Sequence, residues 1–149
     1  MSNDATDTQI LLAEDDPHDA ELTMRVLKKR NLADNLVWAQ DGVAALDFVF
    51  GADYQPGGDL RHKPKLVLLD VKMPKLNGIQ VLERLKSDAA AKIIPVVMLT
   101  SSREERDLLR CYELGVNSYI VKPVAFETFT EAVTQVGLYW MLRNEQPRH

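Results

Sequence analysis

The sequence has little cysteine, no long apolar run and no excess of basic residues. Cys111 is the only cysteine among the 149 residues, so no internal disulfide can form and a reducing compartment is expected. The longest apolar runs have four or five residues, whereas a membrane-spanning helix needs roughly 20. The 22 acidic and 18 basic side chains give a net charge of −4, which argues against binding to duplex nucleic acid. We therefore expect a cytoplasmic protein that binds neither a membrane nor nucleic acid.

Length and composition are typical of one globular domain. A single core is complete at about 100–150 residues, and 46% hydrophobic with 27% charged residues are ordinary globular values. The polar, acidic segment 1–9 lacks the apolar stretch of a secretory signal. We expect residues 1–149 to form a single domain, with a core at about 8–142, a flexible acidic N-terminus and a short C-terminal tail.

Five short apolar runs alternate with amphipathic segments of helical length. The runs cover residues 9–13, 35–39, 65–70, 95–100 and 117–121. The first, third and fourth are nearly continuous in apolar character, which is typical of strands buried on both faces of a parallel sheet. The run at 35–39 has polar neighbours, so we expect it at an edge. Strand–helix alternation repeated five times predicts an α/β fold with a doubly wound, five-stranded parallel sheet.

Capping residues mark the helices between these runs, and turn-forming residues mark one long loop. Residues 51–64 hold most of the turn formers and predict an exposed loop before the third strand. Asp16, before Pro17, is the expected cap of a helix that runs to about residue 30, and Asp41 that of a helix to about residue 50. Asn77 is expected to cap the next helix. Ser102 forms a capping box with Glu105, and Gly115 closes that helix.

Acidic residues follow two of the buried strands. Glu14, Asp15 and Asp16 come directly after the first run, and Asp70 ends the third. Ligands of open parallel sheets gather at the carboxyl ends of strands, where the connection order reverses. Two carboxylates about 4 Å apart repel by roughly 4 kcal/mol at an effective dielectric of 20, so the cluster needs a proton or a cation. Oxygen ligands alone favour Mg²⁺ over zinc.

The alternative is that these acids only stabilise the N-terminus of the first helix. We expect that role for Asp16. Asp70 ends an apolar strand and has no capping role there, so Asp15 and Asp70 together indicate a metal site.

Two more functional side chains end strands at the same edge of the predicted sheet. Thr100 closes the fourth run, and Lys122 follows the fifth. A lysine can pair with an anionic group, and a hydroxyl can donate a hydrogen bond to it. With a carboxylate nucleophile and a divalent metal, these are the parts needed to accept a phosphoryl group.

Four motifs in this order and at these intervals resemble the receiver domains of response regulators in two-component signalling. The motifs are ILLAEDD (10–16), LVLLDVKMPKLNG (66–78), VVMLTSS (96–102) and SYIVKPV (118–124). The resemblance implies a flavodoxin-like (βα)5 fold with strand order 2-1-3-4-5. It implies a signalling protein that takes a phosphoryl group from a histidine kinase and acts on no external substrate. Lys72 lies two residues after Asp70, and Ser102 two residues after Thr100. Both positions flank the phosphoryl pocket and depart from the family pattern, so the resemblance does not determine the lifetime of the phosphorylated state.

The resemblance also assigns roles to single residues. Asp70 would accept the phosphoryl group. Glu14 and Asp15 would bind Mg²⁺ together with Asp70 and the backbone carbonyl of Lys72, while Thr100 and Lys122 would bind phosphoryl oxygens. Thr100 would move toward the phosphate and Tyr119 would swing inward, changing the face formed by the fourth helix, fifth strand and fifth helix. Tyr119 could instead be an ordinary half-buried aromatic residue. The Lys122–Pro123 bond is expected to be cis.

The last helix is expected to begin near Ala125 and to continue past residue 137. Its apolar stripe would consist of Phe126, Phe129, Val133, Val136 and Trp140. Leu138, Tyr139 and Leu142 then lie off the stripe, and such a patch often marks an interface. We expect a homodimer through these residues; scattered exposed apolar residues are the alternative.

Within the receiver family, the loop at 51–64 and the ending GLYWMLRNEQP resemble the small regulators of bacterial phytochrome-type histidine kinases. Two other functions are weighed against this one. A phosphohydrolase of the haloacid-dehalogenase type usually needs a second acid two residues after its nucleophile, where this chain has Lys72. A phosphorylation-independent binding module would not need the set of Asp15, Asp70, Thr100 and Lys122.

Overall fold

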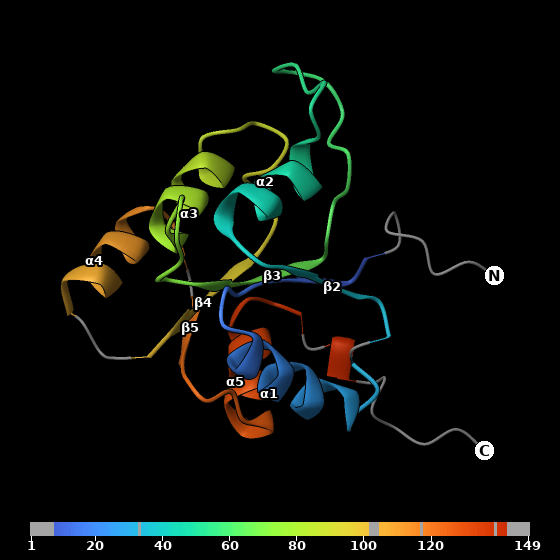
Figure 1. The fold of residues 1–149 in the computed structure, drawn as a ribbon, viewed down its shortest axis with the longest axis vertical. Helices are drawn as coiled ribbons and strands as arrows, with labels where there is room; N and C mark the ends of the chain where they lie inside the picture. Colours follow the sequence, from blue (N-terminus) through green and yellow to red (C-terminus); the bar gives the residue numbers. More distant parts are fainter. Residues whose placement is uncertain (1–7, 33, 102–104, 117, 139, 143–149) are drawn as a thin grey trace.

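The chain forms three layers, with one parallel sheet between two groups of helices (Figure 1). The computed structural model describes residues 8–32, 34–101, 105–116, 118–138 and 140–142. The strands are β1 (Ile10–Ala13), β2 (Leu36–Ala39), β3 (Leu66–Asp70), β4 (Val96–Thr100) and β5 (Ser118–Val121). The helices are α1 (Pro17–Lys28), α2 (Gly42–Phe50), α3 (Gly78–Lys86), α4 (Glu105–Glu113) and α5 (Phe126–Gln135). The strand order β2-β1-β3-β4-β5, parallel throughout, confirms the predicted fold.

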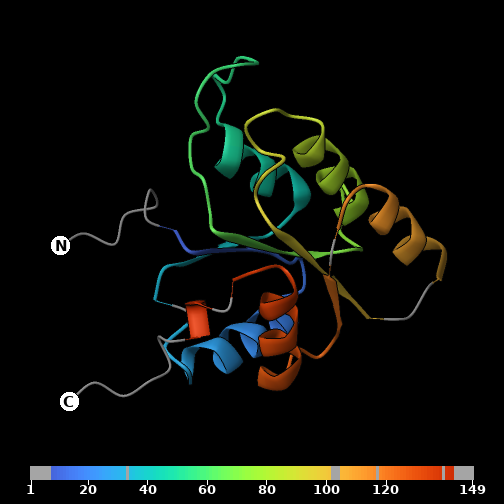
Figure 2. The ribbon, with the colours of Figure 1, turned by 180° about the vertical axis from the view of Figure 1, so that it is seen from behind.

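The sheet separates two apolar cores. Figure 2 shows α1 and α5 on one side of the sheet and α2, α3 and α4 on the other. Successive side chains along a strand point to opposite faces of the sheet. Leu11 packs in the core with α2 and α3, and Leu12 packs in the core with α1 and α5. Both leucines are at most 1% exposed, and each such side chain contributes about 1.5–3 kcal/mol when it is buried. β2 lies at an edge with three half-buried residues, as its sequence predicts.

Three of the predicted helix caps are present. The Asp16 side chain accepts hydrogen bonds from the backbone N–H groups of His18 and Asp19, and Asp41 accepts one from Ala44 at 2.7 Å. Asn77 forms a capping box at the start of α3. Ser102 lies outside the described residues, but Gly115 ends α4 with a φ of +96°, as predicted. α1 starts four residues after the end of β1, and the first residue of α3, Gly78, donates its N–H to the carbonyl of Val71, which follows β3.

The prediction for the last helix was wrong at its C-terminal end. α5 stops at Gln135, because Gly137 adopts a φ of +82° and the Leu138 N–H bonds back to the Val133 carbonyl at 2.7 Å. This left-handed glycine closes the helix. The apolar stripe therefore ends before Trp140, which is 38% exposed.

The loop at 51–64 is long and has neither helix nor strand, as predicted. Several contacts attach it to α2 and to the turn after α3, among them one hydrogen bond and one ion pair between side chains. The Tyr54 hydroxyl donates to the Asp88 carboxylate, and the Arg61 guanidinium lies 3.6 Å from the Asp47 carboxylate. None of the helices in the described ranges is long and apolar enough to cross a lipid bilayer.

Candidate functional site

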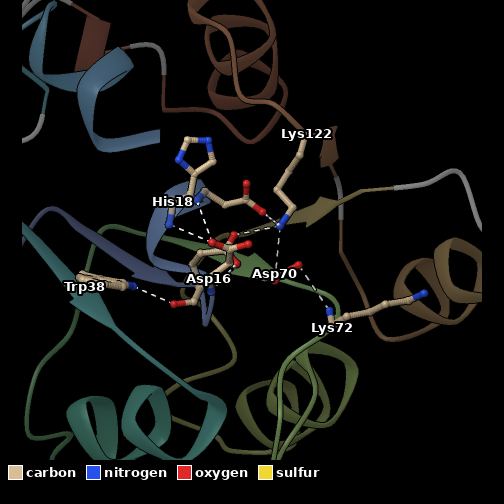
Figure 3. Close-up of polar contacts among 8 residues, drawn as sticks. Asp16, His18, Trp38, Asp70, Lys72 and Lys122 are labelled. Carbon is tan, nitrogen blue, oxygen red and sulfur yellow. Dashed lines mark hydrogen bonds and ion pairs between the residues drawn. The ribbon is translucent and has the colours of Figure 1, made fainter. Parts of the chain in front are cut away.

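The polar side chains that follow the strands meet at one edge of the sheet (Figure 3). Glu14 follows β1, Asp70 is the last residue of β3, and Lys122 follows β5. β1 pairs with β3 in parallel, with Ala13 opposite Leu69, so the residues after these strands lie side by side. Carboxylate oxygens of Glu14, Asp15 and Asp70 lie within 4.8 Å of one another. The structure thus brings the predicted acids together.

Lys122 contacts three carboxylates. Its Nζ lies 3.0 Å from Glu14 Oε1, 3.0 Å from Asp19 Oδ2 and 3.5 Å from Asp70 Oδ2. The lysine side chain is 11% exposed, so these contacts form largely out of water, where charge–charge attraction is stronger. Burial lowers the pKa of Lys122, but its hydrogen bonds to Glu14 and Asp19 outweigh that effect and raise it. The ammonium therefore stays charged.

The two buried acids hold their protons more tightly than free carboxyl groups do. Burial raises the pKa of Glu14 to about 7; its hydrogen bond with Asp70 adds to the effect and Lys122 opposes it. Burial also raises the pKa of Asp70, against the lowering influence of Glu14 and Lys122. Near neutral pH the pair therefore retains part of a proton, which a bound cation can displace.

The donor set fits a hard divalent cation. It consists of three carboxylates, of which Glu14 and Asp70 are buried and Asp15 is exposed. Ions such as Mg²⁺ prefer oxygen ligands of this kind and retain several water molecules, which the exposed side of the cluster allows. The Lys72 backbone N–H lies 3.4 Å from Asp70 Oδ1, and the Lys72 side chain extends away from the acids (Figure 3). The backbone of Lys72 therefore lies next to the Asp70 carboxylate.

Thr100 lies beside Asp70 on the neighbouring strand. It is the last residue of β4 and is 6% exposed, and its carbonyl accepts a 2.7 Å hydrogen bond from the Lys122 backbone N–H. The Lys122–Pro123 peptide is cis, as the resemblance implied. Thr100 therefore ends β4, and Lys122 directly follows β5 on the adjacent strand, with Val121 opposite Thr100.

Tyr119 lies in the middle of β5 and is half-buried. Its ring meets the ring of Tyr112 edge-on, with 6.3 Å between the centroids. Both rings line a depression of about 340 Å³ between α4, β5 and α5. Tyr119 therefore lies at the surface that these three elements share.

Sequence reasoning missed three residues that contribute to the site. Asp19 accepts a 3.0 Å hydrogen bond from the Lys122 ammonium, beside the one that Glu14 accepts. Trp38 on β2 donates from Nε1 to the Glu14 carbonyl at 2.7 Å. Gly78 allows α3 to begin directly against Asp70, because a Cβ there would lie 2.1 Å from the Asp70 carbonyl oxygen. The glycine was visible in the LNG triplet, and Asp19 was visible as an acid in the first turn of a helix that starts at the site.

The candidate interface residues are placed differently from the prediction. Leu138 and Leu142 are half-buried and pack against the core shared with α1 and α5, because the chain turns at Gly137. Tyr139 lies outside the described residues. Trp140 presents the more exposed apolar side chain in this segment, and Met141 is buried.

Comparison with known proteins agrees with this geometry. A model of the response regulator receiver domain matches residues 10–134. The probable methanogenesis regulatory protein FilR2 of Methanothrix harundinacea is 39% identical over 138 residues, which cover 93% of this chain and 86% of FilR2. Response regulator Rcp1 of Synechocystis is 36% identical over 134 residues, which cover 89% of this chain and 88% of Rcp1.

Solved structures show the same likeness. The bacteriophytochrome response regulator AtBRR matches with a TM-score of 0.76 and 50% identity, covering 89% of this chain and 94% of AtBRR. The Mn²⁺-bound form of Rcp1 matches with a TM-score of 0.67 and 34% identity, covering 90% of this chain and 94% of Rcp1. The chain belongs to the family of response regulator receiver domains.

Proposed function

We propose that this chain accepts a phosphoryl group from a histidine kinase on Asp70, in a Mg²⁺-dependent reaction, and signals through altered protein contacts. The observation that carries the proposal is the convergence of Asp70, its acidic neighbours and the Lys122 ammonium at one edge of the sheet. An ion pair alone would not require two neighbouring buried acids, Glu14 and Asp70, whose pKa values are raised by burial.

The transfer needs a nucleophile and groups that hold the charge of the phosphoryl oxygens. An Asp70 carboxylate oxygen attacks the phosphorus of the kinase phosphohistidine, the P–N bond breaks, and the imidazole leaves. The product is an aspartyl phosphate, which water cleaves at the P–O bond to regenerate the carboxylate and inorganic phosphate. Lys122 supplies a positive charge beside the oxygens, and the Thr100 hydroxyl donates a hydrogen bond.

Mg²⁺ would be held by Glu14, Asp15, Asp70 and the backbone carbonyl of Lys72. When bound, it supplies positive charge that neutralises the phosphoryl oxygens in the transition state. Support comes from the oxygen-only donor set and from a solved Mn²⁺-bound form of the relative Rcp1.

The signal would travel from Asp70 to the surface through Thr100 and Tyr119. Thr100 lies on the strand next to Asp70, and Tyr119 lies on the strand after that. A hydroxyl that moves toward the phosphate leaves space that the half-buried Tyr119 ring can fill. Such an inward movement would reshape the depression between α4, β5 and α5, and this face would then distinguish the two phosphorylation states for a partner.

The upstream partner would be a phytochrome-type photoreceptor kinase in the cytoplasm. This assignment rests on the likeness to AtBRR and to other bacteriophytochrome response regulators. The chain would form a homodimer through its C-terminal segment, where Leu138 and Leu142 pack against the core and remain only half-buried. The 38% exposed Trp140 supports an apolar contact there.

The two alternative functions gain no support from the site. A phosphohydrolase would need an acid at Lys72, where the side chain is a base that extends away from the acidic cluster. A phosphorylation-independent binding module would not account for the buried carboxylate pair.

The test is incubation with a small acyl phosphate and Mg²⁺, followed by intact mass measurement. Wild type is expected to gain the mass of one phosphoryl group, and Asp70→Asn is expected to gain none. Asp47→Asn is the matched control, because Asp47 is an exposed carboxylate on α2 whose ion pair with Arg61 is loose. An unlabelled wild type would contradict the proposal, and steady phosphate release from general ester substrates would favour a hydrolase.

A further inference from the structure

Asp19, in the first turn of α1, contacts the ammonium that the proposed phosphoryl group would need. Its Oδ2 accepts a 3.0 Å hydrogen bond from Lys122 Nζ, as short as the bond from Lys122 to Glu14. The contact to Asp70 Oδ2 is longer, at 3.5 Å. Two of the three donors of the ammonium group are thus bonded to Glu14 and Asp19, while Asp70 is in ion-pair contact with it. The ammonium is held toward Glu14 and Asp19, so short bonds to a group on Asp70 require it to move away from one of these two carboxylates.

The three carboxylates differ in the cost of losing the ammonium. Glu14 is fully buried and Asp70 is 4% exposed, so either would be left as a buried charge without its cation. The Asp19 side chain is 34% exposed, so water can solvate its carboxylate. The contact with Asp19 is therefore the one that is broken at the lowest cost.

We propose that Asp19 is a positioning residue that holds the Lys122 ammonium toward α1 and competes for it with the phosphoryl group on Asp70. This inference rests on the phosphorylation of Asp70 proposed above. Before transfer, Asp19 draws the ammonium away from Asp70. During transfer, the phosphoryl oxygens offer strong, charge-assisted hydrogen bonds, and Lys122 exchanges Asp19 for them. The exchange opposes the reaction, so Asp19 slows phosphorylation.

The first test compares the initial rates at which a small acyl phosphate modifies wild type and Asp19→Asn. In this reaction the P–O bond of the donor breaks, an Asp70 oxygen bonds to phosphorus, and the donor carboxylate leaves. At saturating Mg²⁺, Asp19→Asn is expected to react about two- to fivefold faster, the range that corresponds to one partly exposed ion pair. Glu21→Gln is the matched control, because it removes an equal charge from α1. The native Glu21 pairs with Arg25 and not with Lys122, so the phosphorylation rate of this variant is expected to equal that of wild type.

The second test measures Mg²⁺ binding without phosphorylation. Trp38 donates to the Glu14 carbonyl, so its fluorescence reports on the metal site in a Trp140→Phe background. Without Asp19, the ammonium rests on Glu14 and Asp70 and competes more strongly with the cation, so we expect Mg²⁺ to bind about two- to fivefold more weakly. General damage to the site would weaken Mg²⁺ binding and slow phosphorylation together, whereas the proposal requires weaker binding with faster phosphorylation.

The outcomes distinguish the role of Asp19 from the phosphorylation of Asp70. If wild type is phosphorylated but Asp19→Asn is slower or unchanged, the role of Asp19 is overturned and the function of Asp70 stands. If wild type takes up no phosphoryl group, the function of Asp70 fails. Asp19→Glu retains the charge and is expected to return the rate toward that of wild type; a rate as fast as that of Asp19→Asn would overturn the role of the charge.

Discussion

Replacing Glu14 with glutamine should stabilise the metal-free protein at neutral and alkaline pH. The pKa of Glu14 rises from 4.5 to about 7 on folding, chiefly because the carboxyl group is buried. Between these values the folded chain binds a proton that the unfolded chain has released, so the free energy of unfolding falls as the pH rises. One pKa unit corresponds to about 1.4 kcal/mol, so a shift from 4.5 to about 7 sets an upper limit of about 3.4 kcal/mol above pH 7.

The expected gain for Glu14→Gln is smaller than that limit, because Lys122 partly compensates the charge and Asp70 shares the proton. We expect about 1–3 kcal/mol at pH 8, and little change near pH 5, where the carboxyl is already protonated in the folded state. Urea unfolding in the presence of a chelator, from pH 5 to pH 9, measures the effect. Glu21→Gln on the surface of α1 is the control and should stay within about 0.5 kcal/mol of wild type.

This expectation would be refuted if Glu14→Gln were less stable than wild type at pH 8, or if both variants kept the same pH dependence as wild type. Added Mg²⁺ provides a further check within the same experiment. It should stabilise wild type and reverse the ranking, because a cation compensates the buried carboxylate that the glutamine lacks.

Three further variants test other features. Gly78→Ala should lose at least about 2 kcal/mol of stability in a urea melt, because its Cβ would clash with the Asp70 carbonyl at 2.1 Å; a stable variant would show that α3 can shift freely. Tyr54→Phe should lose about 1 kcal/mol by removing the hydrogen bond to Asp88, and no loss would mean that this contact does not attach the loop. Trp140→Ala should shift the sedimentation profile from dimer toward monomer, because it removes the exposed ring proposed for the contact, and an unchanged profile would count against an interface at this segment.

The fold was predictable because the buried strands and the helix caps are local signals. A run such as 66–69 is apolar on both faces and therefore belongs inside a parallel sheet. Asp16 and Asp41 mark helix starts by their own side-chain chemistry. The end of α5 was predicted wrongly, although Gly137 was visible. The apolar residues after it suggested a continuing helical stripe, but after the left-handed glycine Leu138, Met141 and Leu142 pack against the core instead.

The candidate site was predictable where strand order alone determines proximity. Residues that end parallel neighbouring strands must meet, which places Asp70 beside Glu14 and Thr100. The contact between Lys122 and Asp19 depends on the direction in which α1 leaves the sheet and on the rotamer of a long side chain. Neither has a signature in the spacing of residues. The same reason explains why the Trp38 indole could not be assigned to the site in advance.

The loop at 51–64 offers a convenient place for a label. It precedes β3 and therefore lies at the amino ends of the strands, opposite the acidic cluster. Its tip, around Asp59, is exposed, while Tyr54 and Arg61 attach its two arms. The native Cys111 is 1% exposed, so a thiol introduced as Asp59→Cys would react with maleimide dyes far faster than the native one. A fluorophore attached there would report on binding of a kinase while leaving the opposite edge open to it.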